Sequence, residues 1–308
     1  MMRMFQTNME THEALFAATR RQAERALDFH SRHNRFLRFV DTHQKWLLLH
    51  LIADIDAGTN GSGIAVNWIA QRAHDLGIAS RNTTLAFFGQ LSAYGYLVQR
   101  ESRSDRRMRL VSLSRQTEDI LAEWVTGLAA SLAPCLGAEP DPGNQADLDP
   151  YHSLYLPAAK ALLDMSQFIR PPVDICLMQD IRGGWLVMNH LLSGIEVSEC
   201  RDDTVLIPDF TLADHARQFS MSRSTIYRLF RLAEDAALLG WRELGSPPML
   251  WMSGYHLRQY CRWNGRLLGA IRTAIDSAYP MTSSLKAANQ QYFLPASTEI
   301  RAPATRSA

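Results

Sequence analysis

Residues 219–230, FSMSRSTIYRLF, place hydroxyl side chains and an arginine directly ahead of an apolar helical stripe. Ser222 is suited to cap such a helix, because a serine oxygen accepts hydrogen bonds from the free N–H groups of the first turn. The planar guanidinium of Arg223 fits phosphate oxygens and the edge of guanine. Backbone N–H groups at a helix start also favour a nearby phosphate. These residue types would suit contact with nucleic acid.

The helix that follows Ser222 separates an apolar face from a polar one. Its predicted inward residues are Ile226, Leu229, Phe230 and Ala233. Its predicted outward, DNA-facing residues are Ser222, Arg223, Ser224, Thr225, Tyr227 and Arg228. Residues 215–233 hold four arginines and no acid, although the whole chain has a formal net charge of only +1. A capped surface helix without a DNA role can start in the same way, so the neighbouring elements must decide.

Three further elements must hold this helix in place. Residues 211–218 predict a preceding helix that begins with a capping-box-like pair, Thr211 and Asp214. Residues 241–243 and 250–252 predict two strands around a Pro-Pro turn. A helix, a turn, a second helix and a two-stranded ribbon form a winged helix-turn-helix, which sets its second helix in the DNA major groove.

The first half of the chain repeats this order of elements. We expect helices over residues 13–40, 46–57, 66–75, 80–94 and 116–132, and strands over 97–101 and 109–113. The second half adds helices over 151–168, 185–193 and 255–279 and a strand over 205–207. Trp46 and Trp185 begin equivalent helices 139 residues apart, and Thr83 and Thr225 lie 142 residues apart near the start of later ones. The sequence therefore predicts an internal duplication.

The second helix of the first-half motif also carries polar residues at its start. Its predicted DNA-facing residues are Ser80, Arg81, Asn82 and Thr83, and its predicted inward residues are Leu85, Phe88 and Leu91. The alignment of this helix with residues 222–237 stays open by one position. Asn and Arg side chains can form paired hydrogen bonds with adenine and guanine, respectively.

The predicted strand pair of the first half carries a second signal. Residues 99–114, QRESRSDRRMRLVSLS, crowd five arginines against two acids, and the arginines are Arg100, Arg103, Arg106, Arg107 and Arg109. Such a basic hairpin tip fits a minor groove or the DNA backbone. Charge runs are commonly just solvated, but a position after a helix-turn-helix favours DNA contact.

Residues 95–114, GYLVQRESRSDRRMRLVSLS, resemble the wing of the MarR family of bacterial transcription factors. The matching residues are Gly95, Leu97, Val98 and Arg100 in the first strand, Asp105, Arg106 and Arg107 at the tip, and Val111 and Leu113 in the return strand. Ser114 and Gln116 replace a usual Thr and Gly. The resemblance covers residues 30–135. It implies that Asp105 holds the wing arginine and that Arg106 or Arg107 reaches the minor groove.

MarR-like proteins are usually homodimers joined through their terminal helices, whereas this chain carries both units. The resemblance therefore implies an intramolecular pseudo-dimer, either monomeric or further dimerised, on a platform of helices 13–40, 116–132, 151–168 and 255–279. The second wing, residues 241–253, lacks a basic tip. Because residues 80–83 and 223–225 differ, the DNA site should have two unlike halves. Family members often bind small aromatic ligands, and the candidate pocket residues here are Trp46, His50, Trp185, His190, Tyr255 and Trp263.

The predicted fold class is mainly α with small β-wings, in two tandem winged helix-turn-helix units. The length of 308 residues suits two domains. The acidic, Pro-containing stretch 137–150 predicts a linker between a first unit, residues 1–136, and a second unit, residues 151–280. Residues 281–308 predict a flexible tail.

Other classes are disfavoured. The four cysteines form no CxxC pair, which predicts reduced thiols in a cytoplasmic protein without a zinc site, and His30 and His33 lack further ligands. We find no phosphate loop or nucleophile elbow, so we expect no enzyme and no cofactor. The longest apolar run, residues 46–53, is too short to span a membrane. Two alternatives stay open: a plasmid-type replication initiator, and a winged-helix scaffold that binds proteins.

Overall fold

The computed structural model describes residues 2–59, 62–100, 109–132, 149–208, 210–219, 221–242 and 249–278. Over these residues the chain is mainly helical and carries two small three-stranded antiparallel sheets. The prediction of a mainly α protein with small β elements is therefore confirmed. The predicted linker, except for residues 149–150, and the predicted tail lie outside the described residues.

The first half holds five helices and three short strands among its described residues. In chain order these are α1 (Met2–Leu37), α2 (His43–Ala57), β1 (Ile64–Ala65), α3 (Val66–Asp75), α4 (Arg81–Ala93), β2 (Leu97–Arg100), β3 (Leu110–Leu113) and α5 (Arg115–Ser131).

The second half has more, and shorter, helical segments. They are the π-helix η2 (Tyr151–Tyr155), α7 (Leu156–Leu163), α8 (Ser166–Ile169), α9 (Val173–Gln179), α10 (Gly184–Ser193), the 3₁₀-helix η3 (Val197–Arg201), α11 (Leu212–Gln218), α12 (Arg223–Asp235) and α13 (Gly254–Ala278). Its strands are β4 (Thr204–Ile207), β5 (Leu239–Arg242) and β6 (Met249–Ser253).

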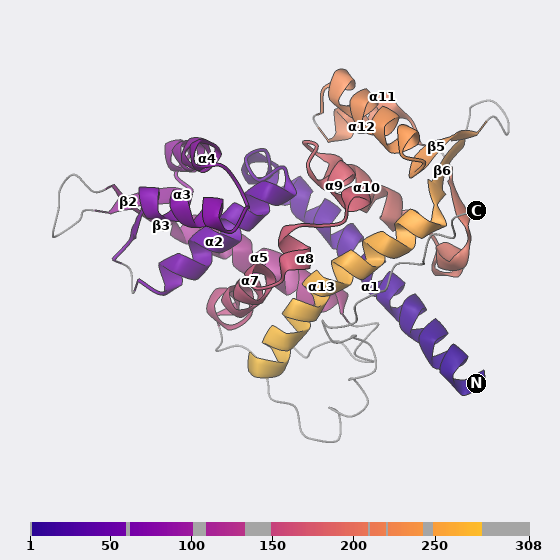
Figure 1. Cartoon of the computed structure of the whole chain (residues 1–308), viewed down its shortest axis with the longest axis horizontal. Coiled ribbons are helices and arrows are strands. Elements are labelled where there is room, and N and C mark those ends of the chain that lie inside the picture. Colours follow the sequence, from indigo (N-terminus) through magenta and orange to yellow (C-terminus); the bar gives the residue numbers. More distant parts are fainter. Residues whose placement is uncertain are drawn as a thin grey trace, which may run out of the picture.

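The two sheets share one topology. Their strand orders are β1-β3-β2 and β4-β6-β5, so in each half the strand before the helix pair joins the last strand of the hairpin. The hairpins start at matching points, with Leu97 opposite Leu113 and Leu239 opposite Met252. The two sheets lie at opposite ends of the long axis of the molecule (Figure 1). The same arrangement of a helix pair and a small sheet thus occurs twice.

The turn between the second helix and the hairpin repeats in backbone detail. Tyr96 N–H donates to Leu91 C=O at 2.9 Å, and Leu238 N–H donates to Ala233 C=O at 2.8 Å. The residue before each donor has a positive φ, which is 77° at Gly95 and 53° at Ala237. Glycine adopts this conformation freely, whereas a side chain makes it costly. Ala237 is the one residue other than glycine with a positive φ in the described ranges.

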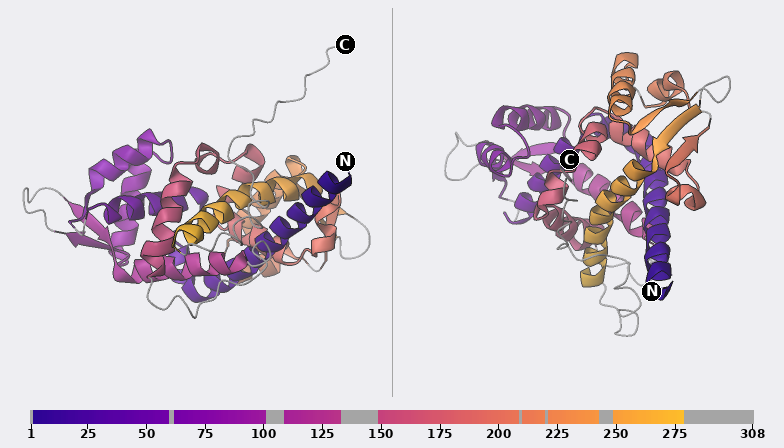
Figure 2. Two further views of the ribbon diagram at one scale, coloured as in Figure 1. Left: turned by 90° about the horizontal axis from the view of Figure 1, so that it is seen from below. Right: turned by 45° about the vertical axis from the view of Figure 1, so that its right-hand side comes forward.

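Helices of each half pack against helices of the other half. α1 of the first half packs on α10 of the second half, and η2 and α7 of the second half pack on α5 and α2 of the first. α13 contacts α1, α5 and α7, so the long helices named as the platform do pack together. α1 and α13 lie next to each other in both views of Figure 2. A Cβ added to Gly265 of α13 would meet Leu15 of α1 at 3.3 Å, which explains a small residue at this crossing.

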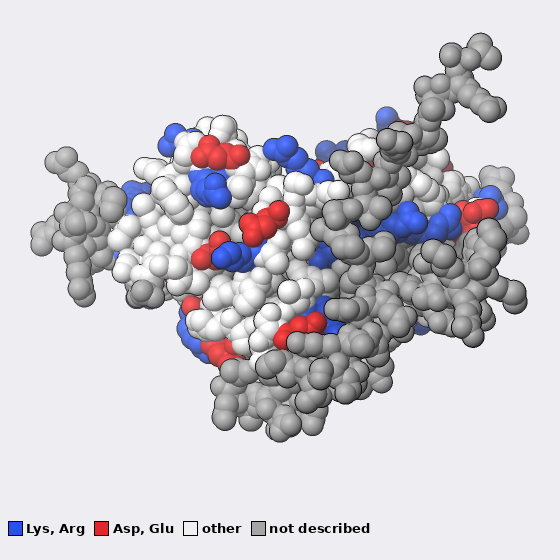
Figure 3. Space-filling view, turned by 60° about the horizontal axis from the view of Figure 1, so that its bottom comes forward, with Lys and Arg blue, Asp and Glu red and all other residues white. Residues whose placement is uncertain are grey.

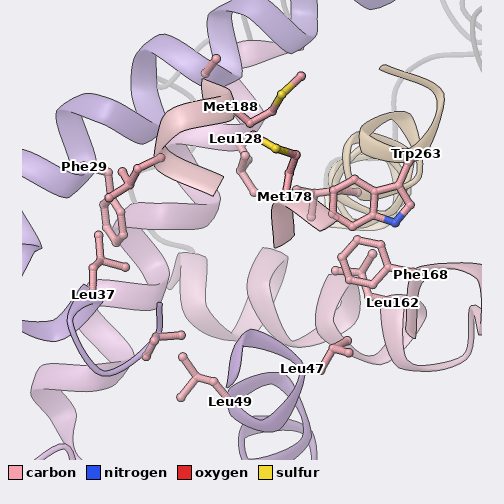
Figure 4. Close-up of a cluster of buried hydrophobic side chains, with 14 of the residues drawn as sticks. Phe29, Leu37, Leu47, Leu49, Leu128, Leu162, Phe168, Met178, Met188 and Trp263 are labelled. Carbon is pink, nitrogen blue, oxygen red and sulfur yellow. The ribbon is translucent and has the colours of Figure 1, made fainter. Parts of the chain in front are cut away.

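The core continues from one half into the other without a break. Buried side chains from α1, α2, α5, α7 and α13 form a single cluster, part of which is drawn in Figure 4. Phe168 and Trp263 stack there with ring centroids 5.5 Å apart. Packing of this kind fixes the relative position of the two helix pairs.

Two helices differ most from their predicted extent. α1 begins at Met2 rather than at residue 13. The predicted helix 151–168 is divided, because η2 precedes α7 and the chain turns at Met165 before α8. Pro157, in the first turn of α7, has no N–H to donate to the preceding turn, which accounts for the irregular hydrogen bonding of η2.

Candidate nucleic-acid interface and central cavity

The start of α12 is fixed by a side-chain cap and an apolar inner face. Ser222 Oγ accepts from Thr225 N–H at 3.1 Å. The inner face consists of Ile226, Leu229, Phe230 and Ala233, none of which is more than 4% exposed. This periodicity turns the opposite side of the helix outward. Both features were predicted from the sequence.

The outer face of α12 presents arginines and a tyrosine. Arg223, Arg228 and Arg231 are exposed, and Tyr227 is 58% exposed. No acidic side chain of the described residues forms an ion pair with these three arginines, whereas Arg217 of α11 pairs with Asp214. The free guanidiniums can therefore meet phosphate or base edges.

The hydroxyl residues at the start of α12 have a different role from the arginines. Ser222 Oγ lies 2.9 Å from Ser224 Oγ and 2.7 Å from Thr225 Oγ1, and Thr225 is half-buried. These hydroxyls are engaged with one another and with the backbone. They organise the first turn, and the arginines and Tyr227 are left to contact a partner.

α4 begins in the same way as α12. Ser80 Oγ accepts from Thr83 N–H at 3.2 Å and lies 2.8 Å from Thr83 Oγ1. Arg81 and Asn82 are exposed, as predicted. Each cap residue of α4 precedes its α12 counterpart by 142 positions, as Gly95 precedes Ala237. The alignment that the sequence left open is thereby fixed.

One prediction for α4 was wrong. Leu85 was expected to face inward, but its side chain is 37% exposed, and Thr84 is buried in its place. Thr84 Oγ1 donates to Ser80 C=O at 3.1 Å, so its polar atom is satisfied inside the helix. The buried stripe runs through Thr84, Phe87, Phe88 and Leu91.

The first wing is described only at its base. Arg109 is exposed beside β3, and its C=O accepts from Val66 N–H at 3.2 Å. The predicted tip residues Arg103, Asp105, Arg106 and Arg107 lie outside the described residues, as do residues 243–248 of the second wing. Sequence reasoning missed Asp56 of α2, whose Oδ2 accepts from Leu113 N–H at 2.7 Å and ties the sheet to α2. An acid near the end of an apolar helix gave no distinguishing signal.

A cavity of about 80 Å³ lies where the two halves meet. Its walls include aromatic residues from both halves in matching positions. Each member of the following pairs is 139 positions from its counterpart: Phe29 and Phe168, Trp46 and Trp185, Trp124 and Trp263. At the same spacing, His50 faces the cavity from α2 and Asn189 from α10. The two sides of the cavity therefore have similar aromatic walls and unlike polar groups.

Three buried polar atoms of residues that line the cavity have no hydrogen-bond partner among the described residues. They are the indole nitrogens of Trp185 and Trp263 and Oδ1 of Asn189, which is only 2% exposed. The amide nitrogen of Asn189 donates to Trp185 C=O at 2.8 Å, so its oxygen is the free end. A buried polar atom without a partner carries a desolvation cost that a ligand or water can relieve.

Two histidines beside the cavity are held neutral. Nδ1 of His50 lies 2.8 Å from the Tyr155 hydroxyl, and burial lowers the pKa of His50 to about 3. His43 bonds through Nε2 to Phe168 C=O at 2.7 Å, and burial lowers its pKa to about 4. The carbonyl requires that Nε2–H of neutral His43 be the donor. The cavity wall therefore carries no charged imidazole near neutral pH.

The predicted pocket residues are only partly brought together. Trp46, His50, Trp185 and Trp263 line the cavity. His190 instead packs against His215 and Phe210, because it lies on the side of α10 that faces α11. Tyr255, at the start of α13, is 60% exposed.

Comparison of the chain with models of known protein families, with characterised proteins and with solved structures yields no match. Over the described ranges no helix combines the length and apolarity needed to cross a membrane. In the same ranges no cluster of three or more His, Cys, Asp or Glu side chains could hold a metal ion.

Proposed function

We propose that this protein is a sequence-specific regulator that binds double-stranded DNA through two tandem winged helix-turn-helix units. The observation that carries the proposal is the outer face of α12. Arg223, Arg228 and Arg231 are exposed there without acidic partners among the described residues, on the second helix of a helix pair that precedes a β-hairpin. A helix in this position enters the major groove, and arginine is the side chain best suited to guanine.

The arrangement of the halves supports simultaneous contact with one duplex. α4 and α12 both lie along the upper side of the molecule in Figure 1. Because helices of each half pack against the other half, the two units share a common core, and one chain acts as a pseudo-dimer. Dimeric regulators place two such helices in successive major-groove turns, about 34–36 Å apart. A single chain that carries both helices would need no second subunit to contact two successive turns.

The basic character is local. On the face in Figure 3, turned toward the lower side of Figure 1, both charge signs are interspersed with wide uncharged areas. The chain as a whole has a formal charge of +1. Steering toward DNA must therefore come from α12 and from the wing arginines, rather than from the net charge.

A small aromatic effector is part of the proposal. The cavity has aromatic walls, and three of its lining residues, Trp185, Trp263 and Asn189, carry buried polar atoms without partners among the described residues. Its 80 Å³ is smaller than the ~150 Å³ that admits benzene in an engineered core, so a ligand would have one ring at most and would displace side chains on entry. Because the cavity lies between the halves, such a ligand would act on their relative position.

The test is fluorescence anisotropy with duplexes from the region upstream of the protein's own coding sequence and with a random-sequence pool. Wild type should bind its own duplex tightly, with affinity that falls steeply with salt. Arg223→Ala and Arg228→Ala should each weaken specific binding by about 1–3 kcal/mol, as expected for a lost base contact. Arg115→Ala, on an exposed arginine of α5 that pairs with Asp119, is the control and should bind like wild type.

Two results would overturn the proposal. One is binding of both DNA samples at only weak background level. The other is equal binding by wild type and both α12 variants. The first unit exposes Trp68, at 53%, and Leu85, at 37%. After the first result, a protein-binding scaffold would become the leading function, since larger patches of exposed apolar side chains mark protein contacts.

A further inference from the structure

The fixed alignment of α4 with α12 allows the two outer faces to be compared position by position. Arg81 and Arg223 occupy the same place, at the first residue of each helix. One turn later the faces diverge. α4 has Leu85, Ala86 and Gly89 where α12 has Tyr227, Arg228 and Arg231, and all six residues are exposed.

The difference changes what each helix can recognise. Arginines form paired hydrogen bonds with guanine, and a tyrosine hydroxyl can donate or accept. Leucine and alanine side chains offer only apolar surface, which in the major groove matches the methyl group of thymine. Asn82, exposed at the second residue of α4, can pair with adenine. α12 therefore favours G·C pairs, and α4 favours A·T pairs.

Gly89 adds to this contrast. A Cβ placed on it would find no heavy atom within 4 Å, so the residue is not required by packing inside the protein. In the middle of a helix, glycine lowers helix propensity. Its absent side chain leaves the backbone of α4 free to approach a partner closely.

We propose that the DNA site of this protein has two half-sites that share the position contacted by Arg81 and Arg223 and differ beyond it. The α12 half-site carries guanine where Arg228 and Arg231 reach, and the α4 half-site carries A·T pairs with exposed thymine methyls. This inference rests on the proposed function. The partner of that interface is then a DNA duplex whose two half-sites form an imperfect inverted repeat.

The experiment selects bound duplexes from a random pool with the full-length chain and sequences them. Wild type should enrich an asymmetric motif with one G-containing and one A·T half. The variant Leu85→Tyr/Ala86→Arg/Gly89→Arg gives α4 the outer face of α12. It should enrich an inverted repeat of the G-containing half. Each mismatched pair should reduce affinity by about 5- to 150-fold, the range expected for one base pair.

A reciprocal variant serves as the matched control. Tyr227→Leu/Arg228→Ala/Arg231→Ala should remove the guanine preference of the second half-site while the α4 half-site stays. All six positions are exposed, so neither variant disturbs the core. Circular dichroism and thermal unfolding should match wild type within a few degrees.

The outcomes separate this inference from the proposed function. Enrichment of no sequence by wild type would remove the proposed function itself. Enrichment of two identical half-sites, or of the G-containing half alone, would overturn the inference and leave DNA binding in place. An asymmetric wild-type motif that the α4 variant leaves unchanged would also overturn it, because the outer face of α4 would then not be the reader.

Discussion

The paired turns at Gly95 and Ala237 predict opposite effects of exchanging glycine and alanine. Both residues have a positive φ, and both are exposed. A Cβ on Gly95 would meet no heavy atom within 4 Å, so no steric clash complicates the exchange. Ala237→Gly should therefore stabilise the protein, and Gly95→Ala should destabilise it.

The magnitude follows from two opposing contributions. A left-handed conformation costs a residue with a Cβ roughly 1–2 kcal/mol. Glycine loses about 0.5–1 kcal/mol more chain entropy than alanine on folding. The difference leaves about 0.5–1 kcal/mol in favour of glycine at either turn. Neither side chain contributes buried area, so no packing contribution is added.

Urea unfolding followed by tryptophan fluorescence measures the difference. With a slope near 3 kcal/mol/M, the midpoint should rise by about 0.2–0.3 M for Ala237→Gly and fall by a similar amount for Gly95→Ala. Ala236→Gly is the matched control, since Ala236 is an exposed neighbour with φ of −91°. It should destabilise, because its backbone gains nothing from glycine. A midpoint that falls in Ala237→Gly as it does in the control would refute the argument.

Two further predictions concern the cavity and its surroundings. Because burial lowers the pKa of His43 to about 4, from an ordinary value near 6.5, the unfolded chain binds more protons between these values, and stability is lost as pH falls through this window. At about 1.4 kcal/mol per pKa unit, His43→Gln should remove about 3 kcal/mol of the pH dependence between pH 6.5 and 4 in urea titrations. Equal slopes in wild type and in His43→Gln would contradict the assignment. Single-ring phenols and aryl carboxylates should quench tryptophan emission in wild type and do so more weakly in Asn189→Leu; no quenching by any of them would exclude the effector.

Element positions could be predicted where local chemistry sets them. Ser80, Ser222 and Thr211 cap the helices that were expected to start there, because a hydroxyl at a helix start satisfies backbone N–H groups within four residues. The buried face of α12 followed from its periodicity. In α4, apolar residues lie on both faces, so the periodicity wrongly predicted that Leu85 is buried. The structure buries Thr84 instead.

The packing of helices across the two halves and the shape of the cavity depend on contacts between distant segments. No local sequence pattern predicts such contacts. The spacing of 139 residues was visible for Trp46 and Trp185. Applied to the remaining aromatic residues, it would have found Trp124 and Trp263, which line the cavity together with the first pair. His190 and Tyr255 were named for their residue type alone, and residue type does not tell which side of a helix faces a cavity.

The packing of helices across the two halves also sets the order in which the protein can fold during its synthesis. α1 is synthesised long before α10, its main packing partner, and α2 must wait for α7. Contacts between segments so far apart slow folding, because the entropy lost in closing the long intervening loop must be overcome before the contacts stabilise the chain. Until residues 156–193 have left the ribosome, the apolar sides of α1 and α2 lack their covering helices. Until then the newly made first half leaves apolar surface uncovered, and the second half completes its fold.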